Sequence, residues 1–255
     1  MSRLVDLSFV VEASPRDLPA FMRIEVEYSD HAQGAAEFEQ LLGVDRRLLR
    51  DEEGPAGERL SIGTHATTHV DAPWHYNSRI AGAPAATIDE LPLDWFYGPG
   101  VVVDVRAKAD GDPVTRSEME QGIADAGHAL APRDIVLVHT GRDAFIAERD
   151  FMWRGPGVTP DATRWLYEQG VRVMGIDAWG WDAPLDGQAK DAKERDEPGI
   201  LWAAHQADIP YSQIERLTNL AALPATGFTV ACFPLKIKRA SAAPARVVAI
   251  LEGEA

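Results

Sequence analysis

The residues best suited to chemistry lie in one short segment, where three of the seven histidines of this 255-residue chain fall within eleven positions. They are His65, His69 and His75, and Asp71 lies between the last two. On an extended backbone, side chains two residues apart point to the same face, so His69 and Asp71 share a face. His65 joins that face if the segment is extended or makes one helical turn. Two imidazoles and a carboxylate that converge are a usual ligand set for a divalent metal, so the segment predicts a metal site.

The chemistry predicted for such a site is hydrolysis of a carbonyl compound. A divalent ion held by two neutral imidazoles and one carboxylate keeps positive charge and open positions, so it can acidify water to a pKa of about 7 and polarise a carbonyl group. His75 follows Asp71 by four residues, past Pro73. A histidine beside the metal but not bound to it can carry the proton from water to the leaving group. Zn²⁺ fits these ligands best, and Mn²⁺ next.

The same segment resembles the signature H-x-G-T-H-x-D-x-P-x-H of the cyclase-family metal hydrolases, which include bacterial kynurenine formamidases and isatin hydrolases. Thr67 stands where that motif has glycine. Further resemblances follow in order along the chain: Asp6-Leu7-Ser8, Val138-His139-Thr140-Gly141, Gly175-Ile176-Asp177, His205, the segment from Glu215 to Leu220, and residues 233–236 and 244–246. The resemblance implies an α+β (mixed α/β) chain with a single-domain swivelling β/β/α-type fold over residues 1–255.

The resemblance also implies a role for each matching position. His65, His69 and Asp71 would bind a first metal ion, and His205 and Glu215 would complete the position of a second. His75 would be the catalytic proton donor and acceptor. His205 and Glu215 are ten residues apart, closer than in the family, and the amide oxygen of the neighbouring Gln206 is an alternative ligand. The implied cofactor is Zn²⁺ or Mn²⁺, as one or two ions.

Aromatic residues near these motifs predict a pocket for a planar substrate. The candidate contacts are Trp74, Trp179, Trp181 and Phe21, with Phe9 as a further candidate. Packing in the core or at a subunit interface is the alternative for the paired tryptophans, and the basic segment 236–239 could bind a substrate carboxylate or face solvent. Three functions stay open: hydrolysis of an amide, cyclic amide or lactone; ring closure with loss of water; and metal binding without catalysis.

The elements that must position these residues are short strands mixed with a few helices. Apolar runs that end at Gly, Pro or Asp predict strands over residues 4–11, 24–28, 100–105, 135–139, 171–176, 228–237 and 245–251. Thr115 with Glu118 predicts a capped helix over 115–127, and Pro160 with Gly170 bounds a helix over 159–170. Weaker patterns predict helices over 35–42, 46–49 and 212–219. The highly charged segment 186–198 predicts an exposed loop more mobile than its surroundings, and a mobile lid over a site is the alternative.

Composition excludes several classes of protein. Lys and Arg number 25 against 40 Asp and Glu, and the formal net charge of −15 argues against nucleic-acid binding and against anionic membrane surfaces. No apolar run approaches the roughly 18 residues that cross a bilayer, and Asp6 interrupts the only stretch that resembles a signal peptide. The single cysteine, Cys232, excludes an internal disulfide and a cysteine-based zinc site. We therefore expect a cytoplasmic enzyme with a small-molecule substrate and, from the resemblance, a homo-oligomer (dimer or tetramer).

Overall fold

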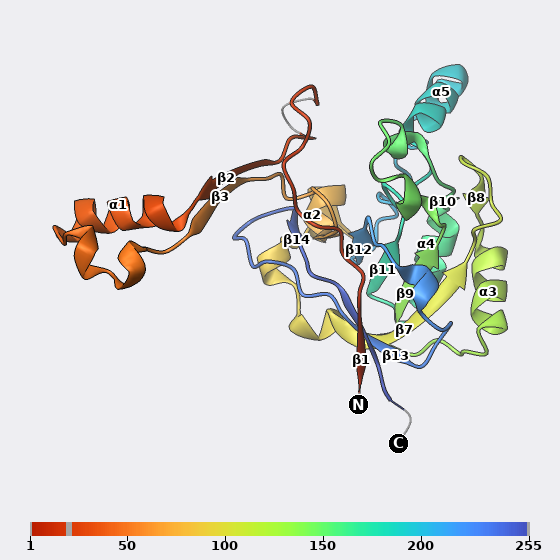
Figure 1. The fold of residues 1–255 in the computed structure, drawn as a ribbon. Coiled ribbons are helices and arrows are strands. Elements are labelled where there is room, and N and C mark those ends of the chain that lie inside the picture. The colour runs from red at the N-terminus through yellow and green to blue at the C-terminus, as the bar shows by residue number, and fades with distance from the viewer. Residues whose placement is uncertain (1, 19–21, 254–255) are drawn as a thin grey trace. The chain divides into compact units, whose positions relative to one another are not determined.

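The computed structural model describes residues 2–18 and 22–253, which form two compact units (Figure 1). The larger unit comprises Met1–Phe9 and Thr67–Ala255, and the smaller unit is Val10–Ala66. Whether both act as one domain, as the sequence predicts for residues 1–255, stays a prediction. No helix in the described part of the chain is both long and apolar enough to cross a membrane.

The larger unit is built on a nine-stranded sheet in the order β1-β15-β13-β7-β9-β11-β12-β4-β14. Its strands are β1 (Arg3–Asp6), β4 (His69–Asp71), β7 (Tyr97–Asp104), β9 (Ile135–His139), β11 (Val173–Ile176), β12 (Ser212–Glu215), β13 (Phe228–Ala231), β14 (Ala242–Pro244) and β15 (Val248–Leu251). The four central strands, from β7 to β12, pair in parallel, and antiparallel strands flank them on both sides. The larger unit also contains the short strands β5 (Arg79–Ile80), β6 (Ala83–Pro84), β8 (Pro113–Val114) and β10 (Gly157–Val158).

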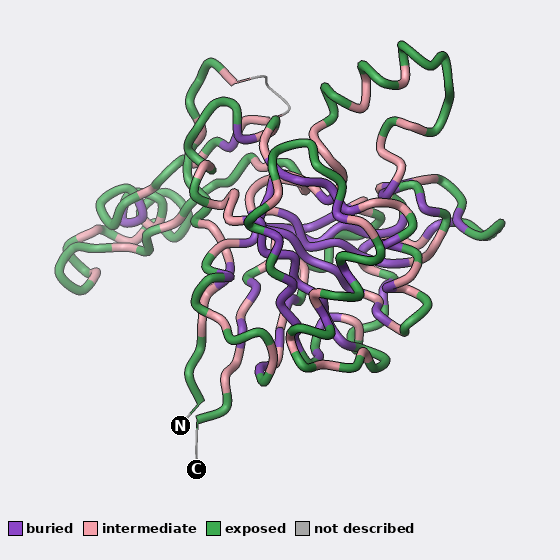
Figure 2. The backbone as a smooth tube through the Cα atoms, turned by 90° about the vertical axis from the view of Figure 1, so that its right-hand side faces the viewer, coloured by how far each residue is buried: buried purple, intermediate pink, exposed green. Residues whose placement is uncertain are grey.

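The helices of this unit lie between strands along the chain, and α3 and α4 pack against the sheet. They are α2 (Pro73–Tyr76), α3 (Arg116–Asp125), α4 (Pro160–Glu168) and α5 (Leu185–Arg195), with short 3₁₀ turns η4 (Ile88–Glu90), η5 (Leu93–Trp95), η6 (Arg142–Phe145), η7 (Phe151–Trp153) and η8 (Leu220–Ala222). Alternate residues of the central strands enter two separate apolar clusters, and α3 and α4 contribute Met119, Ile123, Ala162 and Leu166 to one of them. The buried stretches in Figure 2 gather along these strands.

A buried carboxylate ties together the carboxyl ends of two parallel strands. Asp177, directly after β11, accepts hydrogen bonds from the backbone N–H groups of Thr140 and Gly141 at 2.6 and 2.8 Å, and from the Thr140 hydroxyl at 2.7 Å. Burial raises the pKa of Asp177, and these three donors oppose that rise. Two of the segments that resemble family motifs thus meet at this edge of the sheet.

The smaller unit is a two-stranded ribbon with one helix. Strand β2 (Glu25–Ser29) pairs antiparallel with β3 (Gly57–Ser61), and between them lie α1 (His31–Leu42), η2 (Arg46–Leu48) and η3 (Arg50–Glu52). Asp30 caps α1 in a capping box with Gln33. Gly34 of α1 lies so close to the following chain that a Cβ there would be 1.9 Å from the carbonyl oxygen of Pro55, so only glycine fits.

The mixed α+β class predicted from the sequence is confirmed, and so are the capped helices. Thr115 and Thr159 are the N-caps of α3 and α4, as their capping patterns predict. The helix predicted over 212–219 is wrong, because Ser212–Glu215 is strand β12, fully buried between β11 and β4. The loop predicted over 186–198 is also wrong, because most of it is the exposed helix α5. Its greater mobility stays a prediction.

Helix α5 forms where a loop was predicted because its charged residues are also good helix formers. The segment is rich in Ala, Gln, Lys, Glu and Arg. Lys190 and Glu194 pair at 3.9 Å with the i, i+4 spacing, Asp186 lies in the first turn, and Lys193 and Arg195 lie in the last. The high charge of this segment therefore indicated exposure correctly but not the loss of helical structure.

Candidate metal centre

Two neighbouring strands bring the candidate ligands together. In the antiparallel pair of β4 and β12, Glu215 lies opposite His69 and Gln213 opposite Asp71. The His69 Nε2 atom lies 3.3 Å from Asp71 Oδ1 and 3.6 Å from Glu215 Oε2. One ligand atom from each of these three buried residues lies within 4.8 Å of the others. Segments 144 residues apart thus converge because the strand register sets these residues side by side.

A kink in the backbone before β4 orients the side chain of His69. Thr67 has a φ of 53°, a left-handed conformation that β-branched residues rarely adopt and that glycine adopts readily. The kink lets the Thr67 carbonyl accept a hydrogen bond from His69 Nδ1 at 2.8 Å. Because a carbonyl oxygen only accepts, Nδ1 carries the proton, and Nε2 offers its lone pair toward Asp71 and Glu215.

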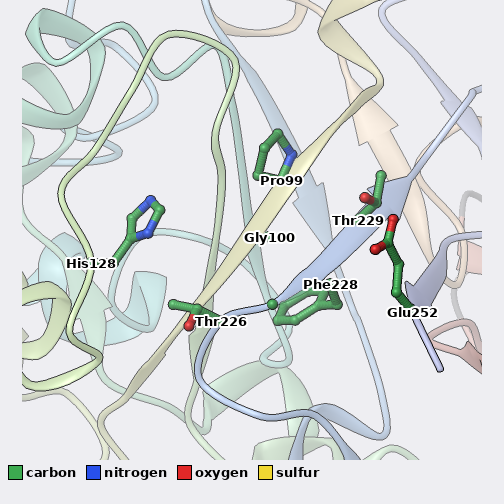
Figure 3. A pocket seen from close by; sticks show the side chains of 8 residues that line it. Pro99, Gly100, His128, Thr226, Phe228, Thr229 and Glu252 are labelled. Carbon is green, nitrogen blue, oxygen red and sulfur yellow. The ribbon is translucent and has the colours of Figure 1, made fainter. Parts of the chain in front are cut away.

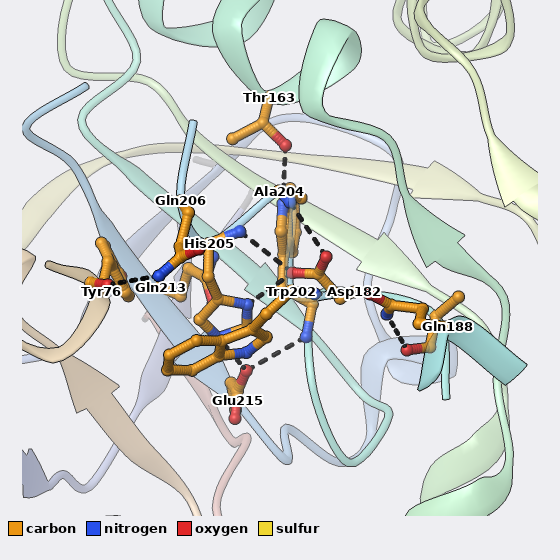
Figure 4. A network of polar contacts seen from close by, with 12 residues as sticks. Tyr76, Thr163, Asp182, Gln188, Trp202, Ala204, His205, Gln206, Gln213 and Glu215 are labelled. Atoms are coloured by element: carbon orange, nitrogen blue, oxygen red, sulfur yellow. Dashed lines mark hydrogen bonds and ion pairs between the residues drawn. The ribbon is translucent and has the colours of Figure 1, made fainter. Parts of the chain in front are cut away.

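His205 joins the centre from a loop and is fixed in the same way (Figure 4). Asp182 accepts hydrogen bonds from the backbone N–H groups of Ala204 and His205 at 2.9 and 3.0 Å, and from His205 Nδ1 at 2.5 Å. His205 Nε2 then lies 3.3 Å from Glu215 Oε1. A carboxylate that holds the far nitrogen of an imidazole is the usual support of a metal-binding histidine.

The buried carboxylates of the cluster favour the binding of a cation. Burial by itself lowers the pKa of His205, but the bonds to Asp182 and Glu215 outweigh it and raise that pKa to about 10. Burial and repulsion from Asp71 both act to raise the pKa of Glu215, yet the bond from His205 holds it below its usual value. Two buried carboxylates beside two imidazoles are stable only with positive charge among them, which a proton on His205 or a divalent ion supplies. The donor set therefore fits a divalent metal.

His75 lies beside this cluster on α2. A ring nitrogen of His75 lies within 4.8 Å of a carboxylate oxygen of Asp71. The imidazole meets the ring of Trp202 edge-on, with centroids 4.9 Å apart, and lies 6.0 Å from the ring of His205. Trp202 in turn stacks on His205 at 4.4 Å. His75 is thus held by aromatic packing next to a candidate ligand.

The remaining predicted site residues divide into several groups. Trp74 is 45% exposed, and Trp179 is half-buried. Trp181 is fully buried and donates to Thr163 at 2.9 Å, so the structure supports core packing rather than substrate contact. The Gln206 amide nitrogen donates hydrogen bonds to the Tyr76 carbonyl and to the Asn77 side chain, both at 3.2 Å. The side chain that lies beside Glu215 is that of His205.

Three further predicted residues remain, Phe21, His65 and Phe9. Phe21 lies outside the described residues. His65 lies in the smaller unit, two residues before the larger unit resumes at Thr67, and its role as a ligand stays a prediction. Phe9 is half-buried in the larger unit, where its backbone N–H donates to the Thr68 hydroxyl at 3.0 Å.

Sequence reasoning missed two residues that shape the centre. These are Asp182, which holds His205, and Trp202, which stacks on it. The spacing of Trp202, three residues before His205, is the one signal in the sequence that could have indicated it. A surface hollow lies elsewhere, on β7 and β13 (Figure 3), and shares no residue with the metal centre; its lining residues are Pro99, Gly100, His128, Thr226, Gly227, Phe228, Thr229 and Glu252.

Comparison with known proteins identifies the class to which this fold and centre belong, the metal-dependent hydrolases with a cyclase-type fold. The chain matches the family described as "Putative cyclase" over residues 5–183. It is 34% identical to a kynurenine formamidase of Salinibacter ruber over 206 residues, covering 79% of this chain and 83% of the relative. It is 29% identical to an isatin hydrolase of Roseibium aggregatum over 215 residues, covering 79% and 78%. The chain therefore belongs to the cyclase family.

Solved structures agree with this fold. Isatin hydrolase A from Ralstonia solanacearum superimposes with a TM-score of 0.75 at 24% identity, covering 98% of this chain and 92% of that one. Isatin hydrolase A from Labrenzia aggregata, bound to benzyl benzoate, superimposes with a TM-score of 0.73 at 24% identity, covering 99% and 94%. The fold that the sequence resemblance implies is confirmed, as is the expectation of a metal-dependent hydrolase.

Proposed function

We propose that this protein hydrolyses an amide, cyclic amide or lactone bond of a small aromatic substrate. The observation that carries the proposal is the convergence of His69, Asp71 and Glu215 within 4.8 Å, with a nitrogen of His75 equally close to Asp71. A purely structural metal site has a closed set of ligands and no use for an adjacent imidazole. The named relatives, a kynurenine formamidase and an isatin hydrolase, support cleavage of a carbon–nitrogen bond next to an aromatic ring.

In this proposal the metal ligands are His65, His69, Asp71, His205 and Glu215. A bound Zn²⁺ or Mn²⁺, as one or two ions, supplies Lewis-acid activation of water and of the substrate carbonyl. Thr67 and Asp182 hold Nδ1 of His69 and His205, so that both Nε2 atoms face the centre.

His75 moves the proton in this mechanism. One ring nitrogen of His75 accepts the proton of the attacking water and then donates it to the leaving nitrogen or oxygen. An amide nitrogen is a poor leaving group unless protonated, so amides require this second transfer. Trp74, Trp179 and Phe21 are the proposed aromatic contacts of the substrate.

We also infer the setting in which the enzyme works. The acidic composition and the single buried cysteine support a cytoplasmic location. Neither membranes nor nucleic acids are expected partners, and the smaller unit supports assembly as a homo-oligomer, a dimer or tetramer.

Elemental analysis of protein purified without added metal tests the proposed ligands. We expect Zn or Mn in the wild type and at least one ion fewer per chain in His69→Ala and Asp71→Ala. His31→Ala is the matched control, because His31 is exposed at the start of α1. Full metal content in both ligand variants would place the site elsewhere.

A substrate screen with N-formylkynurenine, isatin and simple lactones tests the reaction. Hydrolysis in ¹⁸O-labelled water puts one heavy oxygen into the acid product, because the attacking oxygen comes from solvent. Turnover that releases water and incorporates no label would instead identify a ring-closing enzyme.

A further inference from the structure

A positive charge that the proposed mechanism does not use lies next to the metal centre. Arg216 directly follows Glu215, and its φ of 57° is a left-handed conformation that bulky residues rarely adopt. Its backbone N–H donates to the Ala178 carbonyl at 3.1 Å, and its carbonyl accepts from the Thr68 hydroxyl at 2.5 Å. The chain thus turns sharply at Arg216, and both ends of the turn are fixed to segments that border the centre.

The side chain of Arg216 stacks on an aromatic ring. Its Cζ atom lies 3.7 Å from the ring centroid of Trp179, and its Nε atom donates to the Trp179 carbonyl at 3.4 Å. Trp179 packs edge-on against the buried Phe151, with centroids 5.9 Å apart, so the ring beneath the guanidinium is itself supported. Stacking of this kind fixes the guanidinium while leaving its edge open to a ligand.

Among the described residues, no carboxylate pairs with the positive charge of the Arg216 guanidinium. Within residues 2–18 and 22–253, no carboxylate forms an ion pair with Arg216, and its terminal nitrogens have no hydrogen-bond partner. The residue is half-buried and not fully enclosed. A partly buried guanidinium held only by one carbonyl and one ring has four unused N–H donors, in the arrangement that matches a carboxylate.

The carboxylates of the metal centre interact electrostatically with the Arg216 side chain. Burial lowers the pKa of Arg216, and attraction from Glu215 and then Asp71 opposes that change. Both carboxylates are proposed metal ligands, so a divalent ion would neutralise them and leave Arg216 as excess positive charge. In a chain with a formal net charge of −15, such local positive charge is what allows an anion to bind.

We propose that Arg216 binds an anionic group of the substrate, and that the enzyme acts on an amide or lactone bearing a carboxylate. The carboxylate accepts hydrogen bonds from the two terminal nitrogens of Arg216, while the carbonyl to be cleaved binds at the metal centre. This inference rests on the proposed hydrolase function and narrows its substrates. Arg216 is a specificity-determining residue in this assignment, and His75 remains the proton carrier.

Two arylformamides that differ in one group test this assignment on the metal-loaded enzyme. N-formylanthranilate carries a carboxylate beside the formamide, and formanilide lacks it. We expect wild type to favour the acid in kcat/KM, and Arg216→Met to reduce the ratio of the two kcat/KM values by about 30- to 1000-fold, the range for breaking a buried charged contact. The loss should fall on KM for the acid, and Arg216→Lys should restore part of the ratio.

Arg164→Met is the matched control, because Arg164 is exposed on α4 and should keep the wild-type ratio. A wild type without preference for the acid, or an Arg216→Met variant that loses both substrates equally, would overturn the assignment. Metal content and circular dichroism on the same samples separate misfolding from loss of specificity.

If wild type holds metal but cleaves neither formamide, the proposed hydrolase function is in error for this substrate type, and binding still tests Arg216. Benzoate should then bind to the metal-loaded wild type at least tenfold more tightly than to Arg216→Met, whereas benzamide should show no such difference, as measured by calorimetry. Equal benzoate affinity in both proteins would overturn the assignment independently of turnover.

Discussion

At the scale of single residues, a substitution of His75 can separate metal binding from catalysis. If His75 moves protons and binds no metal, His75→Ala keeps its metal while kcat falls about 10²- to 10⁴-fold, with a smaller change in KM. Steady-state kinetics and metal analysis on one preparation measure both quantities. Loss of metal would make His75 a ligand, and an unchanged kcat in a metal-replete variant would remove it from the mechanism.

Asp182 offers a second test at this scale, because it acts through His205. An amide at this position cannot present acceptors to all three N–H donors, so Asp182→Asn disturbs the tautomer that points Nε2 inward. We expect metal affinity to fall about 10- to 100-fold, measured by competition with a chelator. Nitrogen-15 NMR of the histidine rings should show the changed tautomer. Asp186→Asn, exposed on α5, is the control; wild-type affinity in Asp182→Asn would contradict the positioning role.

At the scale of elements, α5 contains a glycine that lowers its helical stability. Gly187 lies in its first turns with an ordinary helical backbone, and a Cβ added there would meet no atom within 4 Å. Gly187→Ala should therefore stabilise the helix by about 0.5–1 kcal/mol. Slower amide hydrogen exchange confined to α5, with unchanged kcat, is the expected result. Unchanged exchange would show that α5 opens only together with its surroundings.

The elements differ in how far sequence could predict them, and the reason is where their stability comes from. Helices α3 and α4 carry their own signals, a capping threonine and a proline at the first position, and both were found. Strand β12 (Ser-Gln-Ile-Glu) has three polar residues in four, all buried, and only its pairing with β11 and β4 makes it a strand. Local sequence patterns cannot indicate such pairing, because the paired residues are far apart along the chain.

The same distinction explains the candidate centre. His69, Asp71 and His75 are close in sequence, so their spacing alone indicated a metal site. Asp182 reaches the centre only through a tertiary contact, its hydrogen bond to His205, and no residue spacing marks it. Arg216 directly follows the predicted ligand Glu215, but the stacking of its side chain on Trp179 is a tertiary contact that no local pattern indicates.

At the scale of the whole molecule, we expect the smaller unit to take part in association between chains. Its buried apolar side chains, among the described residues, are Ile24 and Ala35, too few for a unit of this size to be stable alone. Leu41 and Leu42 of α1 are 78% and 60% exposed, and Leu48 of the adjoining η2 is 68% exposed. Exposed apolar residues gathered on two contacting elements are typical of an interface.

Replacing two of these leucines tests the interface. Leu41→Glu combined with Leu48→Glu should shift the protein from an oligomer to a monomer, measured by light scattering after size exclusion. Leu93→Glu is the control, because Leu93 is 74% exposed in the larger unit. A wild type that is already monomeric, or a double variant with unchanged mass, would exclude this surface as the interface.

The register between β4 and β12 has a consequence for how the enzyme is made. His69 leaves the ribosome long before its partner Glu215, and the parallel strands β7, β9 and β11 are synthesised between the two. A nascent chain can offer the histidine segment to a metal early, but the buried set of ligands exists only once almost the entire larger unit has been synthesised. We therefore expect the ion to reach its complete set of ligands late in biogenesis, and a chain truncated before residue 215 to lack the ligand Glu215.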